Sequence, residues 1–308
     1  MSELSLSEAL PHLVEGDLLE LRDGSIWVVK GCWHGYGGLV AIPRVVLGRK
    51  LKRFSEAYEV TLRYYRHFIR YVDIIGREVP IVPHHEVLRV LRWSVEGVRL
   101  QHPLVRSILD ELWGAGLKCG IAGSYLGGYY SGPSDVDVHC LDLPGSYGRL
   151  RELYESGVLE RLSSGRLWEE VYEVSEAVDL AKHVQLMRYK LLQGVYRGVR
   201  LTIRFVNCDR IKPLLGPYID VRPVELLVEV RVSDYRTPTV IEAEVVRSST
   251  TRVPSTLYLV SHRLRFAEIP EGTFMYIEGP VRLAVGGLHM VNIDESTIRW
   301  LLPPRRGG

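Results

Sequence analysis

Residues 119–140 constrain the fold of this chain more than any other stretch of its sequence. An apolar run ends in Gly123 and Ser124, a short helical segment follows, and a second apolar run begins with Asp135 and Asp137. Side chains alternate along a strand, so the two carboxylates face the same side and can hold a divalent cation between them. Gly123 permits close approach of a phosphate, and Ser124 with the N–H groups of the next helix supplies donors to phosphate oxygens. The stretch therefore predicts a strand, helix and strand that bind a metal ion and a phosphate.

This arrangement resembles the motif of the DNA polymerase beta-like nucleotidyltransferase superfamily, in which Gly-Ser is followed after about ten residues by Asp-x-Asp at the start of a strand. The matching residues are Gly123-Ser124 and Ser134-Asp135-Val136-Asp137. The resemblance implies that Asp135 and Asp137 are the catalytic residues and bind Mg²⁺ or Mn²⁺. It also implies that the substrate is a nucleoside triphosphate whose α-phosphate is attacked by a hydroxyl group.

A narrower resemblance rests on the layout of the whole chain. A β unit that starts with Gly16-Asp17, a β-rich C-terminal part and the fragment Ile203-Arg204-Phe205-Val206 are similar to an archaeal group of predicted nucleotidyltransferases.

The phosphates of the nucleotide need cationic and N–H partners. We predict that this binding set contains Gly123, Ser124, Arg188, Lys190 and Arg204. Ordinary salt bridging is the alternative for each of the three cations.

The sequence departs from the family pattern at the third carboxylate, which active members carry on a later central strand. The strand that fits is 199–206, and its expected position holds Thr202, which cannot supply an anionic metal ligand. Asp142, Asp179 and Asp209 are not obvious replacements. Two interpretations remain: a site with one strongly bound metal ion and slow or conditional transfer, or a pocket that binds nucleotide or RNA without turnover.

Three further residues near the motif have two interpretations each. His139 shares the face of Asp135 and Asp137, so it is either a metal ligand or a hydrogen-bonded neighbour in the core. Tyr129 and Tyr130 can stack on a base, or one ring can pack in the core.

The periodicity of the chain predicts a multidomain α+β protein. Strand and turn signals indicate a small β unit over 1–52, in which Asp23-Gly24 is predicted as the tight turn between strands over 17–22 and 25–30. Helical spacing, including a helix over 86–100, predicts a helical connector over 53–100. A nucleotidyltransferase-like α/β domain follows over 101–215, with helical periodicity predicted over 148–192. Short strands separated by Pro, Gly, Ser and Asp, two of them expected over 273–278 and 281–285, predict a β-barrel or sandwich over 216–308.

Charge gives no global sign of a polyanionic partner, because 39 basic residues nearly cancel 37 acidic ones. Residues 49–70 are locally rich in basic and aromatic side chains, so this segment is a candidate surface for RNA or DNA. A solvated helix face with core aromatics is the alternative. Small barrels often bind oligonucleotides, so the C-terminal barrel is a second candidate surface.

Four cysteines stand far apart without paired spacing, which predicts reduced thiols and a cytoplasmic protein. No stretch approaches the roughly 18 apolar residues that a membrane span needs, so we expect no membrane partner. Scarce Asn and Gln suggest a thermophilic source, although a GC-rich genome also depletes Asn.

We therefore expect a metal-dependent nucleotidyltransferase that moves a nucleoside monophosphate to a hydroxyl of RNA, protein or a small molecule. The alternative is a catalytically degenerate domain of the same fold that acts as a nucleic-acid or protein binding module.

Overall fold

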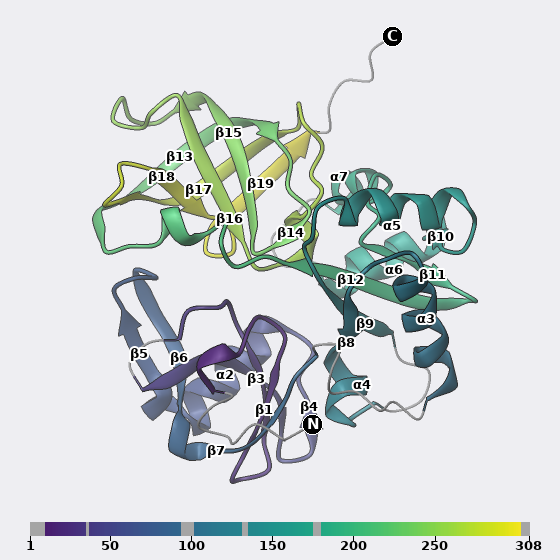
Figure 1. Cartoon of the computed structure of the whole chain (residues 1–308). Coiled ribbons are helices and arrows are strands. Elements are labelled where there is room, and N and C mark those ends of the chain that lie inside the picture. The colour runs from purple at the N-terminus through teal and green to yellow at the C-terminus, as the bar shows by residue number, and fades with distance from the viewer. Residues whose placement is uncertain (1–9, 35–36, 94–101, 131–134, 175–179, 303–308) are drawn as a thin grey trace. The chain divides into compact units, whose positions relative to one another are not determined.

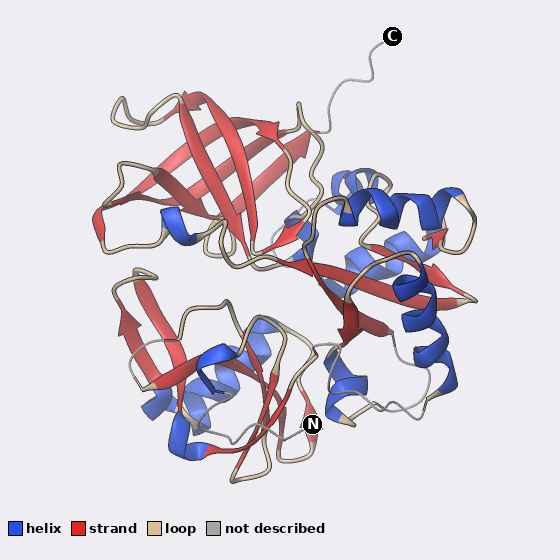
Figure 2. Cartoon of the chain, in the orientation of Figure 1, coloured by secondary structure: helices blue, strands red, loops and turns tan. Residues whose placement is uncertain are grey.

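The computed structural model describes residues 10–34, 37–93, 102–130, 135–174 and 180–302. The chain divides into two compact units, and both contain helices and strands (Figures 1 and 2). The predicted α+β class is thus confirmed. The first unit comprises Met1–Val72, Arg77–Leu159 and Val195–Val206, and the second comprises Asp73–Gly76, Glu160–Gly194 and Asn207–Gly308. Every described helix is too short or too polar to cross a bilayer.

The first unit begins with a hairpin whose turn chemistry is readable in the sequence. Strands β1 (Leu18–Leu21) and β2 (Ile26–Val29) pair antiparallel, and Gly24 supplies the positive φ of +79° that the tight turn needs. The Asp23 carboxylate accepts a hydrogen bond of 2.9 Å from the Ser25 N–H and fixes the turn. The predicted strand, turn and strand are therefore confirmed.

Five further strands extend this hairpin to a seven-stranded sheet. Its order is β5-β6-β3-β2-β1-β7, with β4 paired to β3. Helix α2 packs on the sheet through Ala57 and Thr61, over a core that includes Trp27 and Phe68. The added elements are β3 (Gly38–Val46), β4 (Arg49–Lys50), α2 (Phe54–Tyr64), β5 (Ile69–Val72), β6 (Arg77–Pro83) and β7 (Val87–Leu91), with short 3-10 turns at Leu10–His12, Arg66–Phe68 and His84–Glu86.

The predicted helix over 86–100 is wrong for the part that the structure describes. Val87–Leu91 forms strand β7, which pairs antiparallel with β1, and residues 94–100 lie outside the described residues. Local apolar spacing does not distinguish a short helix from a strand. The segment forms a strand because the backbone N–H and C=O groups along the free edge of β1 need hydrogen-bond partners. In the connector over 53–100, the only described α-helix is α2.

The second half of the first unit contains the predicted motif. Strand β9 (Val136–Leu141) pairs antiparallel with β8 (Cys119–Ile121) and parallel with β12 (Val199–Val206), which confirms the predicted strands. The sheet order is β11-β12-β9-β8, and the apolar side chains between its polar positions are buried. The other elements are α3 (Pro103–Gly114), α4 (Gly123–Gly127), α5 (Ser146–Glu155) and β11 (Gln193–Tyr196).

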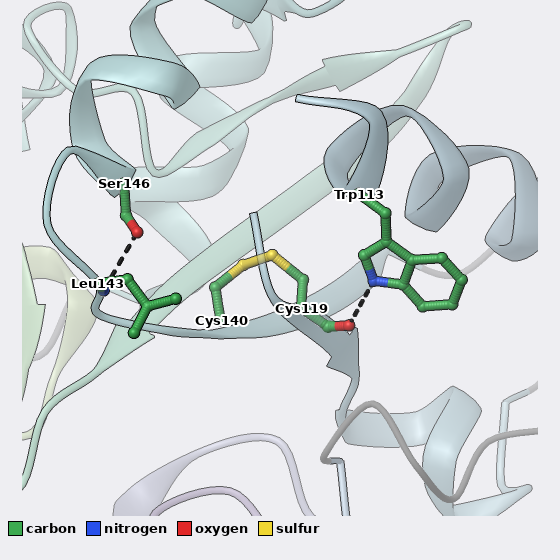
Figure 3. The surroundings of a disulfide bond; sticks show 5 residues. All are labelled: Trp113, Cys119, Cys140, Leu143 and Ser146. Atoms are coloured by element: carbon green, nitrogen blue, oxygen red, sulfur yellow. Dashed lines mark hydrogen bonds between the residues drawn. A yellow bond between two sulfur atoms is a disulfide. The ribbon is translucent and has the colours of Figure 1, made fainter. Parts of the chain in front are cut away.

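A disulfide joins β8 to β9, which corrects the prediction of reduced thiols. Cys119 and Cys140 stand directly opposite each other in the antiparallel pair and are bonded, and the structure has no free cysteine (Figure 3). The Trp113 indole N–H donates a 2.8 Å hydrogen bond to the Cys119 carbonyl. The two cysteines are 21 residues apart, so strand register, not sequence spacing, brings them together. Disulfides are usual in oxidising compartments and in the intracellular proteins of hyperthermophiles.

The second unit contains a closed five-stranded barrel, which confirms the predicted barrel or sandwich as a barrel. The long strand β13 (Tyr218–Val232) pairs with both β15 and β17 and so closes the ring β13-β15-β16-β18-β17. Apolar residues from every strand of the ring fill its core. The other strands are β15 (Thr239–Ser248), β16 (Thr256–Ser261), β17 (Phe274–Ala284), β18 (His289–Asn292) and β19 (Thr297–Leu302), which pairs with β17.

The same unit contains two helices from the predicted helical stretch over 148–192. Helices α6 (Ser164–Val174) and α7 (Leu180–Met187) share a small core that includes Leu167 and Met187. The short strands of this unit are β10 (Glu160–Arg161) and β14 (Arg236–Thr237), and the remaining 3-10 turns are Lys212–Leu214 and Leu264–Phe266.

Candidate functional site

The two predicted aspartates lie at the start of β9. Asp135 directly precedes the strand, and Asp137 is its second residue. The parallel register with β12 places Thr202 directly beside Asp137 and Arg204 beside His139. The strand position at which a third carboxylate was expected is therefore adjacent to Asp137, and its side chain is neutral.

A guanidinium group from β12 already contacts the first aspartate. The Arg200 Nε lies 2.8 Å from the Asp135 Oδ1, and both side chains are partly exposed. Such a pair is worth about 1 kcal/mol or less in water, so a more strongly bound cation can displace it.

The Gly123 turn packs directly against the second aspartate. Gly123 begins α4 with a φ of +60°, and a Cβ at this position would lie 2.2 Å from the Asp137 Oδ2. The Ala122 N–H also donates a 2.8 Å hydrogen bond to the Asp137 carbonyl. Ser124 follows in the helix and is buried. Only glycine fits this turn, because any side chain would displace the Asp137 carboxylate.

Three cations act on Asp137 through their charge. Burial raises the pKa of the Asp137 carboxyl, while the charges of Arg204, Arg44 and Lys50 lower it and that of Asp135 raises it. Arg204 comes from β12, whereas Arg44 and Lys50 come from β3 and β4 of the N-terminal sheet. A half-buried carboxylate with neighbouring cations can hold a metal ion, while the cations bind phosphate oxygens.

Tyr129 belongs to the same group of side chains. The Lys50 Nζ lies 5.6 Å from the centre of the Tyr129 ring. Burial raises the pKa of the Tyr129 hydroxyl, with Arg44 opposing this rise and Asp137 adding to it. Of the two tyrosines that were predicted to stack on a base, Tyr129 is therefore the one beside the cations of the site.

Tyr130 has a different partner. It is 45 % exposed, and its ring stacks on Tyr125 with centroids 4.6 Å apart.

His139 is a packing residue of the core. It is 6 % exposed, and its ring presses against Gly16, where a Cβ would lie 2.0 Å from the imidazole Cε1. The Trp93 ring meets it edge-on at 5.5 Å. Burial lowers the pKa of His139 to about 3, with Arg204 as the next largest cause, so the ring is neutral near pH 7. Of the two interpretations of His139, these contacts favour the core neighbour.

The Gly16-Asp17 fragment anchors the N-terminal sheet beside this histidine. Asp17 is buried, and its carboxylate accepts hydrogen bonds from the N–H groups of Val14 at 3.0 Å and Trp93 at 3.1 Å. The Trp93 indole N–H donates to the Glu15 carbonyl at 3.1 Å. These bonds, together with the packing of Gly16 on His139, hold the N-terminal sheet against β9. The same contact places Arg44 and Lys50 near Asp137.

Two of the predicted phosphate ligands are not part of this group. Arg188 and Lys190 belong to the second unit. Lys190 is 2 % exposed, and its ammonium group donates to the carbonyls of Leu264 at 3.0 Å and Arg265 at 2.7 Å. Lys190 therefore has a structural role within that unit. Arg188 is exposed, and its carbonyl accepts a hydrogen bond of 3.2 Å from Arg161.

The remaining carboxylates do not complete a three-ligand metal site. Asp142 follows the far end of β9, Asp209 belongs to the second unit, and Asp179 lies outside the described residues. Within the part of the chain that the structure describes, no group of three or more His, Cys, Asp or Glu side chains can hold a metal ion. Mg²⁺ is commonly held by one or two carboxylates together with substrate phosphates. Asp135 and Asp137 thus fit one Mg²⁺ shared with a nucleotide, and they do not fit a pair of ions.

Arg44 and Lys50 are the site residues that the motif did not reveal. Both precede the Gly-Ser turn by more than 70 residues, and Lys50 was visible only as a member of the basic segment over 49–70.

Comparison of the chain with protein-family models, with curated proteins and with solved structures finds no match.

Proposed function

We propose that this protein is a metal-dependent nucleotidyltransferase with a nucleotide site formed by Gly123, Ser124, Asp135 and Asp137. The observation that carries the proposal is the tight packing of the Gly123 turn on Asp137, where Cβ and Oδ2 would be 2.2 Å apart. Such a turn brings backbone N–H groups and a carboxylate to one point, which is what a phosphate-bound metal ion requires.

The surrounding residues have separable roles in this proposal. Arg44, Lys50 and Arg204 neutralise the triphosphate, while Ser124 and the N–H groups of the turn hydrogen-bond its oxygens. Asp135, which pairs with Arg200 in this structure, would be one of the two carboxylates that hold the metal ion. A bound Mg²⁺ would supply charge neutralisation at the α-phosphate and would orient the leaving group.

The transfer step forms one bond and breaks one. The acceptor hydroxyl oxygen bonds to the α-phosphorus, and the bond from that phosphorus to the bridging oxygen breaks. Pyrophosphate leaves with the electron pair of the broken bond, and a phosphodiester joins the acceptor to the nucleoside. The hydroxyl proton passes to water, because Thr202 offers no carboxylate at the adjacent strand position. Loss of a positioned base typically costs about 10²- to 10⁴-fold in rate, so we expect slow transfer.

The second candidate function is nucleotide or RNA binding without turnover. Two observations favour it: the Arg200 guanidinium contacts Asp135, and Thr202 stands beside Asp137. Both features lower the negative charge that would hold catalytic metal ions.

Calorimetry with the four ribonucleoside triphosphates, in Mg²⁺ and in Mn²⁺ at elevated temperature, tests the nucleotide site. We expect metal-dependent binding that is lost in the double variant Asp135→Asn, Asp137→Asn. It should be retained in Asp110→Asn, which changes an exposed carboxylate on α3. Absence of binding to the wild-type protein with either metal would refute the proposal.

Pyrophosphate release separates the two candidate functions. Slow release by the wild-type protein in the presence of an acceptor supports transfer, whereas tight nucleotide binding without release supports the binding function. The variant Thr202→Asp places a carboxylate beside Asp137. If the site has transferase geometry, this variant should release pyrophosphate faster than the wild type.

A further inference from the structure

The positive charge of this chain is concentrated in one segment of the first unit. Residues 49–70 contain seven Lys and Arg against two Glu, a net charge of +5, whereas the rest of the chain carries −3. All seven cations are exposed: Arg49, Lys50, Lys52, Arg53, Arg63, Arg66 and Arg70. The segment contains β4 and α2 and lies in the N-terminal part of the first unit (Figure 1). A cation cluster on a chain whose remainder is acidic indicates a polyanionic partner.

Helix α2 exposes apolar side chains in the same segment. Phe54, Tyr58 and Leu62 follow each other at four-residue spacing and are 42 %, 40 % and 41 % exposed. The opposite side of the helix packs on the sheet through Ala57 and Thr61. A helix that buries one face and also exposes such a stripe has a second, uncovered apolar surface.

The two aromatic rings of the stripe are aligned with each other. The Phe54 and Tyr58 rings are 11° from parallel, with centroids 6.4 Å apart. Tyr64, at the end of the helix, is 47 % exposed, and the Arg63 guanidinium lies 5.3 Å from the centre of its ring. Flat rings beside guanidinium groups are the combination on which unpaired nucleobases stack.

The acidic residues of the segment leave most of this charge uncompensated. Glu56 pairs with the Arg49 guanidinium and accepts a 3.1 Å hydrogen bond from the Lys52 N–H. Its carboxylate thus stabilises the junction of β4 and α2. Glu59 is the only other acidic residue of the segment, whereas five more basic residues remain.

The barrel, our other candidate surface, has a different charge pattern. Two of its exposed arginines are paired with neighbouring acids, Arg231 with Glu229 at 2.9 Å and Arg299 with Glu278. Paired charges of this kind offer a polyanion little gain in free energy. The charges therefore favour α2 over the barrel.

We propose that the exposed face of α2 binds single-stranded nucleic acid, with bases on Phe54 and Tyr58 and phosphates on the surrounding cations. Lys50 connects this face to the nucleotide site, because it follows Arg49 in β4 and its Nζ lies 5.6 Å from the centre of the Tyr129 ring. The next assignment rests on the proposed function: the end of the bound nucleic-acid strand is the acceptor that carries the attacking hydroxyl.

Fluorescence anisotropy of the full-length protein with labelled oligomers of about 12 unpaired nucleotides, one of RNA and one of DNA, tests the surface. Binding is measured from about 50 to 300 mM salt, because log K should fall linearly with log salt. We expect binding of at least one oligomer. The comparison of the two identifies any contribution of the 2′-hydroxyl. No binding of either oligomer at the lowest salt overturns the proposal.

Two variants separate stacking from charge. Phe54→Ala with Tyr58→Ala should weaken binding about 20-fold or more, given the usual stacking contribution of each ring. Lys52→Gln with Arg53→Gln should reduce the magnitude of the salt slope by about 1.4, which corresponds to two phosphate contacts. Unchanged affinity in the first variant or an unchanged slope in the second contradicts the proposal.

Helix α6 provides the matched control. Trp168 and Tyr172 have the same four-residue spacing and are 49 % and 70 % exposed, but the sequence of α6 holds three glutamates and one arginine. Trp168→Ala with Tyr172→Ala should leave oligomer binding unchanged, and an equal loss in this variant overturns the assignment to α2.

Nucleotide binding distinguishes failure of this proposal from failure of the proposed function. The α2 variants should bind ATP with Mg²⁺ as the wild type does, and Asp135→Asn with Asp137→Asn should still bind the oligomer. If the oligomer binds through α2 but the protein binds no triphosphate, α2 is a nucleic-acid binding surface and its role as acceptor site is refuted.

Discussion

Replacement of Gly123 by alanine is the sharpest test of the nucleotide site. The new Cβ would lie 2.2 Å from the Asp137 Oδ2, whereas ordinary contact begins near 3.4 Å. The carboxylate must therefore move by about 1 Å. A displacement of that size typically costs about 100-fold in the productive alignment of a reacting group.

Gly123→Ala also has a backbone cost, which a second glycine of the same helix measures separately. Gly128 ends α4 with a φ of +69°, close to the +60° of Gly123, and a Cβ there would have no neighbour within 4 Å. Each substitution places alanine in the left-handed region at a cost of about 1–2 kcal/mol. The two variants thus share the backbone strain, and only Gly123→Ala displaces Asp137.

Calorimetric titration with ATP and Mg²⁺, together with thermal unfolding, measures both effects. Because Asp137 is only half-buried and its carboxylate can move, unlike the buried ring of His139, we expect similar melting temperatures for the two variants, nearly normal nucleotide affinity in Gly128→Ala, and an affinity about 100-fold lower in Gly123→Ala. That difference corresponds to about 2.7 kcal/mol of binding free energy. If Gly123→Ala binds within about threefold of Gly128→Ala, the carboxylate does not hold the nucleotide's metal ion and the reasoning fails.

Three further predictions concern stability. Burial lowers the pKa of His183 from its ordinary 6.5 to about 3, so the unfolded chain binds a proton that the folded one does not. His183 should therefore lower the free energy of unfolding by about 1.4 kcal/mol per pH unit as the pH drops from 6.5 towards 3, and His183→Leu should make the pH slope shallower by that amount in urea unfolding at pH 7, 5 and 4. Removing the disulfide with Cys119→Ala and Cys140→Ala should cost about 3 kcal/mol, given a separation of 21 residues, and an unchanged melting temperature would contradict this. Gly16→Ala should lower the melting temperature far more than Gly24→Ala, because a Cβ at Gly16 would lie 2.0 Å from an imidazole carbon. Gly24 also has a positive φ, +79°, but a Cβ there would have no neighbour within 4 Å. Equal losses in the two variants would show that backbone strain alone is responsible.

The local parts of the fold followed from the sequence because short-range chemistry specifies them. Asp23-Gly24 between two apolar runs defines a hairpin, and Gly24 indeed supplies the positive φ. The alternation of Asp135 and Asp137 predicts that both face one side of the chain at the start of β9, and the structure places Thr202 beside Asp137 in the neighbouring strand. These features depend on the period of a strand and on the conformational freedom of glycine, both of which operate within a few residues.

The longer elements of the fold were predicted less well, for a consistent reason. Residues 87–91 have an apolar spacing that fits a helix, yet they complete an open sheet edge as β7. Residues 273–285 seemed to contain two strands, but Phe274–Ala284 is one strand, because β13 pairs with it over nearly its whole length. Strand partners distant in sequence decide such cases.

In the candidate site, too, some features follow from the sequence and others from the tertiary structure. The sequence by itself determined the Gly-Ser turn, the two aspartates and the neutral threonine. Only the tertiary structure decided which cations surround Asp137, since Arg44 and Lys50 come from the N-terminal sheet and Lys190 is engaged by barrel carbonyls instead. It also decided that Cys119 and Cys140 are bonded. Charge–charge contacts and disulfides depend on distances in space between segments far apart in the chain, and those distances are set by the packing of whole sheets.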